Sequence, residues 1–357
     1  MPDLDPSDFT VAWIAPLAIE AEAATLMLDG LYPDRFEHKR GDDYVFLPGH
    51  LQGLKIIIAT LPGGEEYGTG SAGAIASQVK SFFPNIWFGL LVGVAAGLPN
   101  LARAPPRDIR LGDVLVAVAD GEQPGLVAYD LGKDTGGDLE LLHSGRVLAK
   151  TERIVRSAIT SIQRRMPSDS QIFLRHFDFL QKKVEAMGKF VDPGQDKDKL
   201  YDTDDKGKTI EVQRQPRPEA QRTRVWYGSI GSGDKLMKNA RNRDRLRDRF
   251  DLIGLEMEAA GTMNQIPVGV IRGVCDYADK HKNKDWQPYA AAMAAAYAKA
   301  VLLEIIPKRT ASEQTSAEGG SGSATGRPGG PVFHGPISGR NVMAGWSTRG
   351  NTNQTFN

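Results

Sequence analysis

The sequence predicts an α/β domain built on a mostly parallel sheet. Apolar, strand-like runs alternate with helical patterns along most of the chain, and such alternation requires crossover connections between parallel strands. The chain has 357 residues, of which 41% are hydrophobic, which is enough for one large α/β domain with appendages. An Ala-rich segment of high helix propensity, residues 286–307, closes the pattern.

The expected elements follow in a regular order. Residues 10–17 form a first strand of apolar residues, and a helix begins near Glu20. A helix is expected at 70–83, where small and apolar residues recur at helical spacing. Further strands, each a run rich in Val, Ile and Leu, are expected at 55–61, 86–95, 113–120, 224–233 and within 253–279.

Four segments fall outside this alternation. Residues 1–9 are expected to form an N-terminal tail. Residues of about 150–222 begin as a charged, helix-like stretch and are expected to be an exposed, partly disordered insertion. Residues 309–331 have the composition of a flexible Gly/Ser-rich linker, and a short tail, residues 332–357, follows it.

Composition and charge argue against several classes of function. The formal net charge is zero, so no global field attracts nucleic acid or an anionic membrane. The single cysteine, Cys275, excludes a disulfide framework and suits a reducing cytosol, so we expect a cytoplasmic protein. Residues 1–10 do not resemble a signal peptide, and the apolar stretches are too short or too interrupted to span a membrane.

Standard catalytic motifs do not occur in the sequence. It has no P-loop, HExxH, CxxC or GxSxG pattern, and we expect neither a metal nor a cofactor. The stretch GVAAGL at 93–98 places glycines directly after an apolar strand, where backbone can approach a ligand. Taken alone, these glycines are better explained by close packing of a helix on the strand.

Carboxylates flank one apolar run near the end of the domain. Glu256 and Glu258 precede it, and Asp276 and Asp279 follow it. A buried carboxylate is unfavourable unless it is paired, hydrogen-bonded or used on a ligand. Helix caps and salt bridges are one interpretation of these four acids, and a ligand site is the other.

Five motifs together resemble the nucleoside phosphorylase and nucleosidase superfamily. They are WIAPLAIEAEA, LVGVAAGLP with DIRLGDVLVA, GSGDKLMKNA, GLEMEAAG and VIRGVCDYAD, in that order. The resemblance is strongest to nucleosidase-like domains of fungal immune receptors and covers residues 10–306, except for the insertion. It implies a three-layer fold, with a central twisted mixed sheet flanked by helices, in a homo-oligomer that is a dimer, trimer or hexamer.

The resemblance also implies roles for residues near the apolar run. Glu258 of the EMEA motif would bind the ribose hydroxyls, with Met257 packed under the sugar. Asp276 would be the general acid that protonates the purine N7 and turns the base into a neutral leaving group. The apolar strand that ends at Asp276 is expected to raise its pKa through desolvation, which suits an acid.

The first strand is expected to supply the other half of the chemistry. By resemblance, Glu20 holds and deprotonates the attacking water, and Arg272 helps to fix that water. Glu20 could instead interact with the positive end of a helix dipole, and Arg272 could pair with a neighbouring acid. Phosphorylases of the superfamily carry a GDPxR-like motif and an Arg and a Ser where this chain has APLAIE, Leu91 and Val94. Water is therefore the expected nucleophile, because a phosphate dianion needs several donors or positive charges.

The substrate contacts implied by the resemblance lie in two loops. Gly93, Val94 and Ala95 follow the strand at 86–95. Asp234, Leu236 and Met237 belong to the motif that grips the base, where an aliphatic pair replaces the usual aromatic residue.

A basic run, residues 235–250, follows the base-binding motif. It is either a solvated helix face, or Lys235, Lys238 or Arg241 meets a 5′-phosphate chain. Related immune-effector nucleosidases remove adenine from ATP, so the resemblance favours ATP or another adenine nucleotide as substrate.

Three interpretations of function compete. A purine nucleosidase releases free base by hydrolysis, and a phosphorylase consumes inorganic phosphate. A degenerate domain would only sense a ligand or oligomerise, although Glu20, Glu258, Arg272 and Asp276 are all retained. The tail at 332–357 is either a disordered end or a short amyloid-like assembly motif that contacts a receptor or other copies, as in a fungal immune effector.

Overall fold

The structure, a computed structural model, describes residues 4–64, 66–130, 132–134, 139–141, 148–183, 188–203 and 209–305. These residues all belong to one compact unit of the chain. The predicted linker at 309–331 and tail at 332–357 lie outside the described residues, so their assignments stay predictions.

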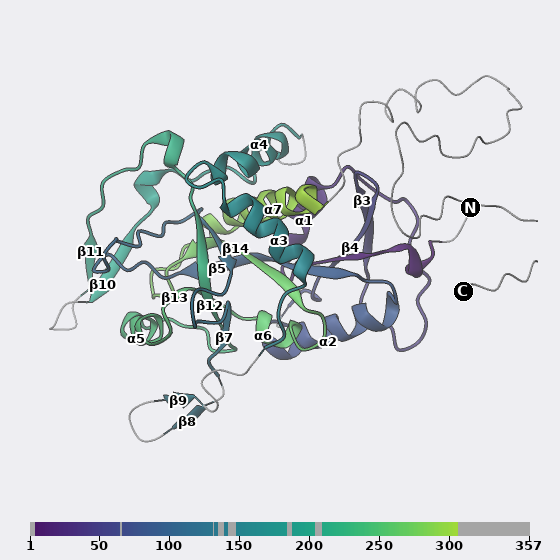
Figure 1. Ribbon diagram of the computed structural model, residues 1–357, viewed down its shortest axis with the longest axis horizontal. Helices are drawn as coiled ribbons and strands as arrows, with labels where there is room; N and C mark the ends of the chain where they lie inside the picture. The colour runs from purple at the N-terminus through teal and green to yellow at the C-terminus, as the bar shows by residue number, and fades with distance from the viewer. Residues whose placement is uncertain are drawn as a thin grey trace, which may run out of the picture. The chain divides into compact units, whose positions relative to one another are not determined.

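A ten-stranded mixed sheet forms the centre of the domain (Figure 1). Its strands are β1 (Val11–Ile14), β2 (Gly30–Leu31), β3 (Leu47–Leu51), β4 (Leu54–Ala59), β5 (Phe88–Gly97), β6 (Val114–Ala117), β7 (Leu126–Ala128), β12 (Val225–Ser232), β13 (Leu252–Glu256) and β14 (Val268–Asp276). Two separate hairpins pair β8 (Gly132–Asp134) with β9 (Leu139–Leu141) and β10 (Leu200–Thr203) with β11 (Thr209–Val212).

The strand order is β13-β12-β6-β14-β5-β1-β4-β3-β2, with β7 paired to β12. Strands β1, β4, β5 and β14 run parallel to their neighbours at the centre, whereas β6 is antiparallel to β14. Strand β13 also pairs with β5, with Gly254 opposite Gly97. The pairings therefore close a ring of five strands, β14-β5-β13-β12-β6, which we call the strand ring.

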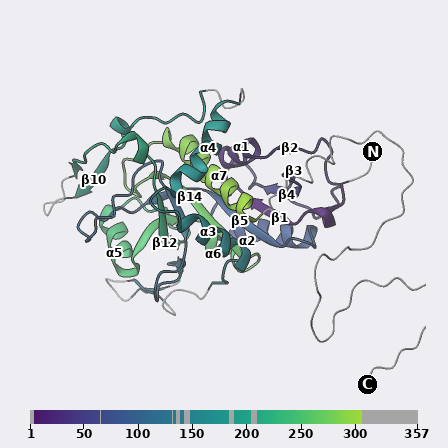
Figure 2. The ribbon, with the colours of Figure 1, turned by 45° about the horizontal axis from the view of Figure 1, so that its top comes forward.

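Helices cover both faces of the sheet and give the three layers that the sequence predicts. They are α1 (Ala18–Met27), α2 (Gly68–Phe82), α3 (Arg153–Gln163), α4 (Asp169–Gln181), α5 (Ala240–Phe250), α6 (Ala259–Thr262) and α7 (Trp286–Ile305). Helix α7 packs on β14 and β5, and α1, α3 and α4 pack on α7. Helices α2 and α6 lie on the opposite face in both views (Figures 1 and 2). The predicted fold class is thus confirmed.

The central strands and α7 form for simple reasons. All four residues of β1 are buried, as expected of a parallel strand covered on both faces. Helix α7 is buried around almost its whole circumference, and its alanines let the backbone approach the sheet closely. Gly273 of β14 lies against the carbonyl of Ala290, where a Cβ would not fit.

The segment at 150–222 differs from the exposed insertion that its charge suggested. Helix α3 carries buried apolar residues at helical spacing, and α4 buries Phe173 and Phe177 against the domain. Further along, Arg217 pairs with Asp113, which is fully buried. An apolar stripe within a charged sequence is enough to dock a helix, and averaging over composition hides such a stripe. Residues 184–187 and 204–208 lie outside the described part.

The start of the chain also packs on the domain. A 3₁₀ turn, η1 (Pro6–Asp8), precedes β1, and Phe9 is fully buried with its ring edge-on to Phe36 and Phe83. Short turns of the same kind, η3 (Gln195–Lys197) and η4 (Glu219–Gln221), occur in the insertion. No helix among the described residues is long and apolar enough to span a membrane.

Candidate active site

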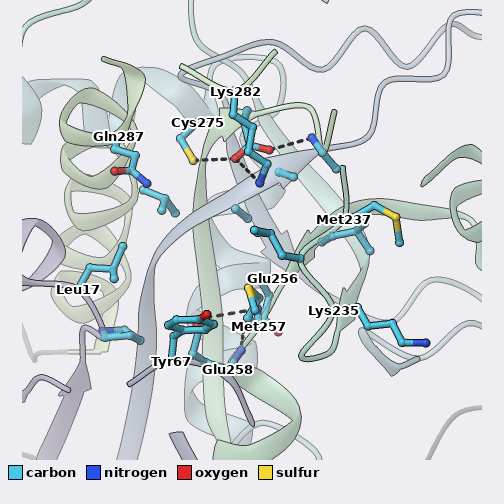
Figure 3. Close-up of a pocket in the computed structure, with 18 of the residues that line it drawn as sticks. Leu17, Tyr67, Lys235, Met237, Glu256, Met257, Glu258, Cys275, Lys282 and Gln287 are labelled. Carbon is cyan, nitrogen blue, oxygen red and sulfur yellow. Dashed lines mark hydrogen bonds and ion pairs between the residues drawn. The ribbon is translucent and has the colours of Figure 1, made fainter. Parts of the chain in front are cut away.

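A cavity of about 420 Å³ lies where β1, β5 and β14 end (Figure 3). These strands are parallel neighbours, so their carboxyl ends meet on one side of the sheet, where α/β folds commonly bind ligands. Its lining includes Leu17, Glu20, Tyr67, Val94, Ala95, Tyr129, Lys235, Leu236, Met237, Glu256, Met257, Glu258, Cys275, Asp276, Lys282, Lys284 and Gln287.

Glu20 reaches the cavity from the first turn of α1. Its side chain is buried, and its two carboxylate oxygens accept the backbone N–H groups of Leu17, at 2.8 Å, and Val94, at 2.7 Å. Burial raises the pKa of Glu20, and the positive charge of Arg272 opposes that rise. Glu20 is therefore a fixed carboxyl whose affinity for a proton is increased, as a general base requires.

Arg272 lies in the middle of β14 and is completely buried. Its guanidinium donates to Glu256 and, at 3.0 Å, to Glu258, while its Nε has no hydrogen-bond partner among the described residues. Burial opposes its charge, but the three glutamates around it outweigh burial and raise its pKa. Gly93 leaves space for this cluster, because a Cβ there would lie 2.7 Å from Nη1 of Arg272 and closer still to Glu20.

The EMEA motif forms the tight turn between β13 and α6. Glu256 points back into the protein, where it accepts the N–H groups of Glu258 and Ala259 and pairs with Arg272. Glu258 points toward the cavity beside Met257. Burial raises the pKa of Glu258 to about 7, against the lowering by Arg272 and with a further rise from Glu256. One acid of the motif thus supports the turn, and the other faces the cavity.

Asp276, at the end of β14, lies at the other end of the cavity. Figure 3 shows Cys275 and Lys282 there, whereas Met257, Glu258 and Tyr67 lie at the opposite end. Asp276 accepts a hydrogen bond from the N–H of Ala278 at 2.8 Å and forms an ion pair with Lys282 at 3.1 Å. The loop after β14 thus brings a cation to the carboxylate, a neighbour that the apolar sequence of the strand did not indicate.

Cys275 is buried beside Asp276, and burial raises the pKa of its thiol well above the usual value. It is therefore a poor nucleophile at neutral pH. No group of three or more His, Cys, Asp or Glu side chains in the described part is arranged to hold a metal ion.

Three curated proteins resemble the sequence, and two of them differ in kind. An NLR-like protein (nucleotide-binding leucine-rich repeat) of Hyaloscypha variabilis is 34% identical over 313 residues, which is 86% of this chain and 30% of that protein. A 5′-methylthioadenosine/S-adenosylhomocysteine nucleosidase of Mycobacterium bovis is 32% identical over 93 residues, 25% of this chain and 36% of that protein. The chain thus spans about a third of the length of each relative. No family model matches it.

Solved structures of other proteins superpose on most of this chain. Futalosine hydrolase of Helicobacter pylori superposes with a TM-score of 0.54 and 17% identity, over 83% of this chain and 98% of that one. The 5′-methylthioadenosine/S-adenosylhomocysteine nucleosidase of Neisseria meningitidis gives a TM-score of 0.51 and 18% identity, over 82% and 98%. The chain has the nucleoside phosphorylase and nucleosidase fold.

Within this nucleosidase fold, most of the residues expected from the sequence meet at one cavity. Glu20, Glu258, Asp276, Val94 and Ala95 line it. Met257, Leu236 and Met237 line it too, and the side chain of Leu236 is 54% exposed. Arg272 and Gly93 are not among the lining residues: Arg272 donates to Glu258, and Gly93 leaves the space that Glu20 occupies. The binding and catalytic roles of these residues are taken up as proposals below.

Three expected ligand contacts lie elsewhere in the nucleosidase fold. Asp234 is turned toward α2, where it accepts the backbone N–H of Thr69 at 2.6 Å and its hydroxyl at 2.9 Å. It therefore caps that helix instead of lining the cavity. Lys238 and Arg241 line a separate hollow of about 350 Å³, so of the three basic residues only Lys235 reaches the site.

Sequence patterns missed several residues that line the cavity of the nucleosidase fold. Tyr67 directly precedes α2, Gln287 lies in the first turn of α7, and Tyr129 follows the short strand β7. Lys282 and Lys284 belong to the stretch KHKNK at 280–284, and the concentration of basic residues there could have indicated that this loop lines the site.

Proposed function

We propose that this chain is a purine nucleosidase that hydrolyses the base–ribose bond of an adenine nucleotide. The observation that carries the proposal is the arrangement of carboxyl groups around one cavity. Glu20 and Glu258 lie near Arg272, while Asp276 lies at the opposite end, and Leu236 and Met237 of the predicted base-binding motif line the same cavity.

This arrangement can move one proton onto the base and take one from water. The carboxyl of Asp276 gives a proton to N7 as the N-glycosidic bond breaks, so the base leaves as a neutral molecule. Glu20 accepts a proton from the water whose oxygen bonds to C1′ of the ribose. Glu258 accepts hydrogen bonds from the ribose hydroxyls and fixes the sugar between the two groups.

Water is favoured over phosphate by the charges at the nucleophile's position. The region beside Glu20 also holds Glu256 and Glu258, and Arg272 is the buried cation that already pairs with both of the latter. A phosphate dianion would meet these carboxylates with few donors left to hold it. The phosphorylase alternative is therefore less favoured, and a purely degenerate domain would have no need of a buried Arg272–Glu258 pair.

Lysines at the cavity support a substrate that carries phosphate. Lys235, Lys282 and Lys284 line it from two different loops, and Lys284 forms no ion pair with any described residue. Lys284 precedes Gln287, which lies with Leu17 on the side of the cavity away from Met237 (Figure 3). ATP is our first choice among adenine nucleotides.

A role in immunity is proposed from the similarity to the NLR-like protein over 86% of this chain. In this proposal the enzyme depletes a nucleotide when it is clustered, and residues 332–357 recruit it through an amyloid-like assembly. A peptide of residues 332–357 is expected to form fibrils that bind thioflavin. If the peptide stays monomeric, and removal of everything after residue 308 changes neither assembly nor cellular effect, the tail has no such role.

The enzymatic proposal is tested with the purified full chain. Adenosine, AMP, ATP, guanosine and inosine are incubated with and without inorganic phosphate, and released bases and sugars are separated by chromatography. We expect adenine and an intact ribose phosphate without added phosphate. Base release that requires phosphate and yields ribose 1-phosphate would establish a phosphorylase, and no release from any substrate would favour the degenerate module.

A further inference from the structure

A second cavity, of about 300 Å³, adjoins the candidate active site behind Asp276. It shares Cys275, Asp276 and Lys282 with the first cavity. Its other walls come from the loop after β14, residues 279–283, and from the insertion, which supplies Lys197, Lys199 and Tyr201. The insertion that the sequence set apart thus reaches the candidate general acid.

Positive charge dominates the lining of this second cavity. Four lysines line it, Lys197, Lys199, Lys280 and Lys282, against two acids, Asp276 and Asp279. Neither Lys197 nor Lys280 forms an ion pair with any described residue. Lysines on separate segments repel one another, so their convergence on one hollow favours an anion between them.

The other charges in the cavity are already engaged. Lys199 pairs with Glu211 at 2.7 Å on the exposed β10–β11 hairpin, and Lys282 pairs with Asp276 at 3.1 Å. Asp279 is buried, and its Oδ1 accepts the N–H of His281 at 2.7 Å. Its Oδ2 has no partner among the described residues, so Asp279, like Asp276, opposes an anion.

The segment that bears two of these lysines is held rigidly against the strand of the general acid. Asp198, between Lys197 and Lys199, accepts the hydroxyl of Tyr277 and, at 2.9 Å, the guanidinium of Arg214. The ring of Tyr201 stacks on His281 with centroids 4.0 Å apart. The cavity is therefore preformed, which lowers the entropy lost when a ligand binds.

We propose that this second cavity binds a phosphate chain. Lysine ammonium groups are compact point charges that bind phosphate well, and a hollow of this size admits a small anion but not a macromolecule. An occupant would compete with Asp276 for Lys282, so binding here changes the contacts of the candidate general acid. The chain of phosphates comes either from the substrate or from a free polyanion, and the proposal does not require the nucleosidase activity.

Calorimetric titration of the full-length protein with inorganic tripolyphosphate tests the proposal. The variant Lys197→Ala/Lys280→Ala removes the two unpaired lysines, and Lys80→Ala/Lys150→Ala removes two exposed lysines that line neither cavity. We expect the first variant to bind about tenfold or more weakly and the control to bind as the wild type does, because each charged hydrogen bond contributes to affinity. Both lysines of the first variant are exposed, so both proteins should fold.

Two results would overturn the proposal. The first is no binding of tripolyphosphate to the wild type at millimolar concentration. The second is binding that survives in Lys197→Ala/Lys280→Ala but is lost in Lys235→Ala/Lys284→Ala, which would place the anion in the first cavity.

Turnover measurements distinguish the two possible sources of the phosphate chain. If it is the substrate's own chain, Lys197→Ala/Lys280→Ala raises KM for ATP but not for adenosine. If it is a free polyanion, the two KM values stay equal to those of the wild type, and tripolyphosphate alters turnover of adenosine. A wild type that binds tripolyphosphate without releasing base would refute the nucleosidase proposal and leave this one standing.

Discussion

Replacing Gly93 by alanine tests the cluster at the core of the candidate site. The added Cβ would lie 2.5 Å from Cδ of Glu20 and 2.7 Å from Nη1 of Arg272. Non-bonded carbon atoms prefer about 3.5–4.0 Å, so the carboxylate must move by roughly 1 Å. It cannot move freely, because the N–H groups of Leu17 and Val94 hold both of its oxygens.

The expected effects follow from that displacement. Overpacking of a well-packed interior destabilises proteins by about 1–3 kcal/mol, and we expect Gly93→Ala to fall in this range. A shift of about 1 Å in a catalytic group can lower turnover about 100-fold, so base release should fall by one to two orders of magnitude. The loss comes from displacement of Glu20 and Arg272, since alanine adds volume at this position but no charge.

Urea unfolding and base release are measured on Gly93→Ala together with Gly70→Ala. Gly70 lies in the exposed first turn of α2, and a Cβ there would meet nothing within 4 Å. This control should be as active as the wild type and up to about 1 kcal/mol more stable, because alanine favours helix. If Gly93→Ala unfolds at the wild-type urea concentration and keeps full activity, the Glu20 carboxylate does not lie against Gly93.

Three further predictions concern the carboxyl groups. Asp276→Asn should lower base release about 10²–10⁴-fold with little change in stability, because an amide cannot deliver the proton; near-normal turnover would remove Asp276 from the mechanism. In the wild type we expect 2′-deoxy substrates to lose roughly 1–3 kcal/mol of transition-state stabilisation relative to ribonucleotides, because the buried carboxylate of Glu258 then lacks one hydrogen-bond donor. Glu258→Gln should lower turnover of ribonucleotides and reduce this difference. Equal wild-type rates on both substrates would contradict the role of Glu258. Burial raises the pKa of Glu258 from 4.5 to about 7, so the stability it contributes is complete below pH 4.5 and is lost as pH rises through about 7. Comparing urea unfolding of the wild type and Glu258→Gln from pH 4 to 8 checks this sign, because only the wild type should show this loss of stability.

The central strands could be predicted because burial on both faces makes them continuous apolar runs. The strand expected at 86–95 is β5 at Phe88–Gly97, and that at 224–233 is β12 at Val225–Ser232. Strand β3, with the sequence LPGHL, has no such run and was missed. It is held by pairing with β4, and pairing partners are not visible in a strand's own composition.

Part of the candidate site could be predicted, because one motif contains both the residue that faces the cavity and the residue that fixes the backbone turn. EMEA places Glu258 in the cavity because Glu256 holds the turn from below, through Arg272 and the N–H of Ala259. Residues in connecting loops were not predictable in this way. Lys282 reaches Asp276 only through the path of the loop after β14, and Asp234 turns to α2, which is distant in sequence.

Closure of the strand ring has a consequence for how copies of this domain can meet. Strand β13 is hydrogen-bonded on both sides, to β12 and to β5. This end of the sheet therefore offers no row of unpaired backbone N–H and C=O groups to another chain. In the ten-stranded sheet the terminal strands that remain are β2 and β7, with two and three residues, and the strands of the separate β8–β9 and β10–β11 hairpins have three and four residues. Unpaired edges this short are poor templates for intermolecular β-pairing. Under the proposal that residues 332–357 form an amyloid-like assembly, the folded domain itself therefore resists recruitment into the cross-β structure.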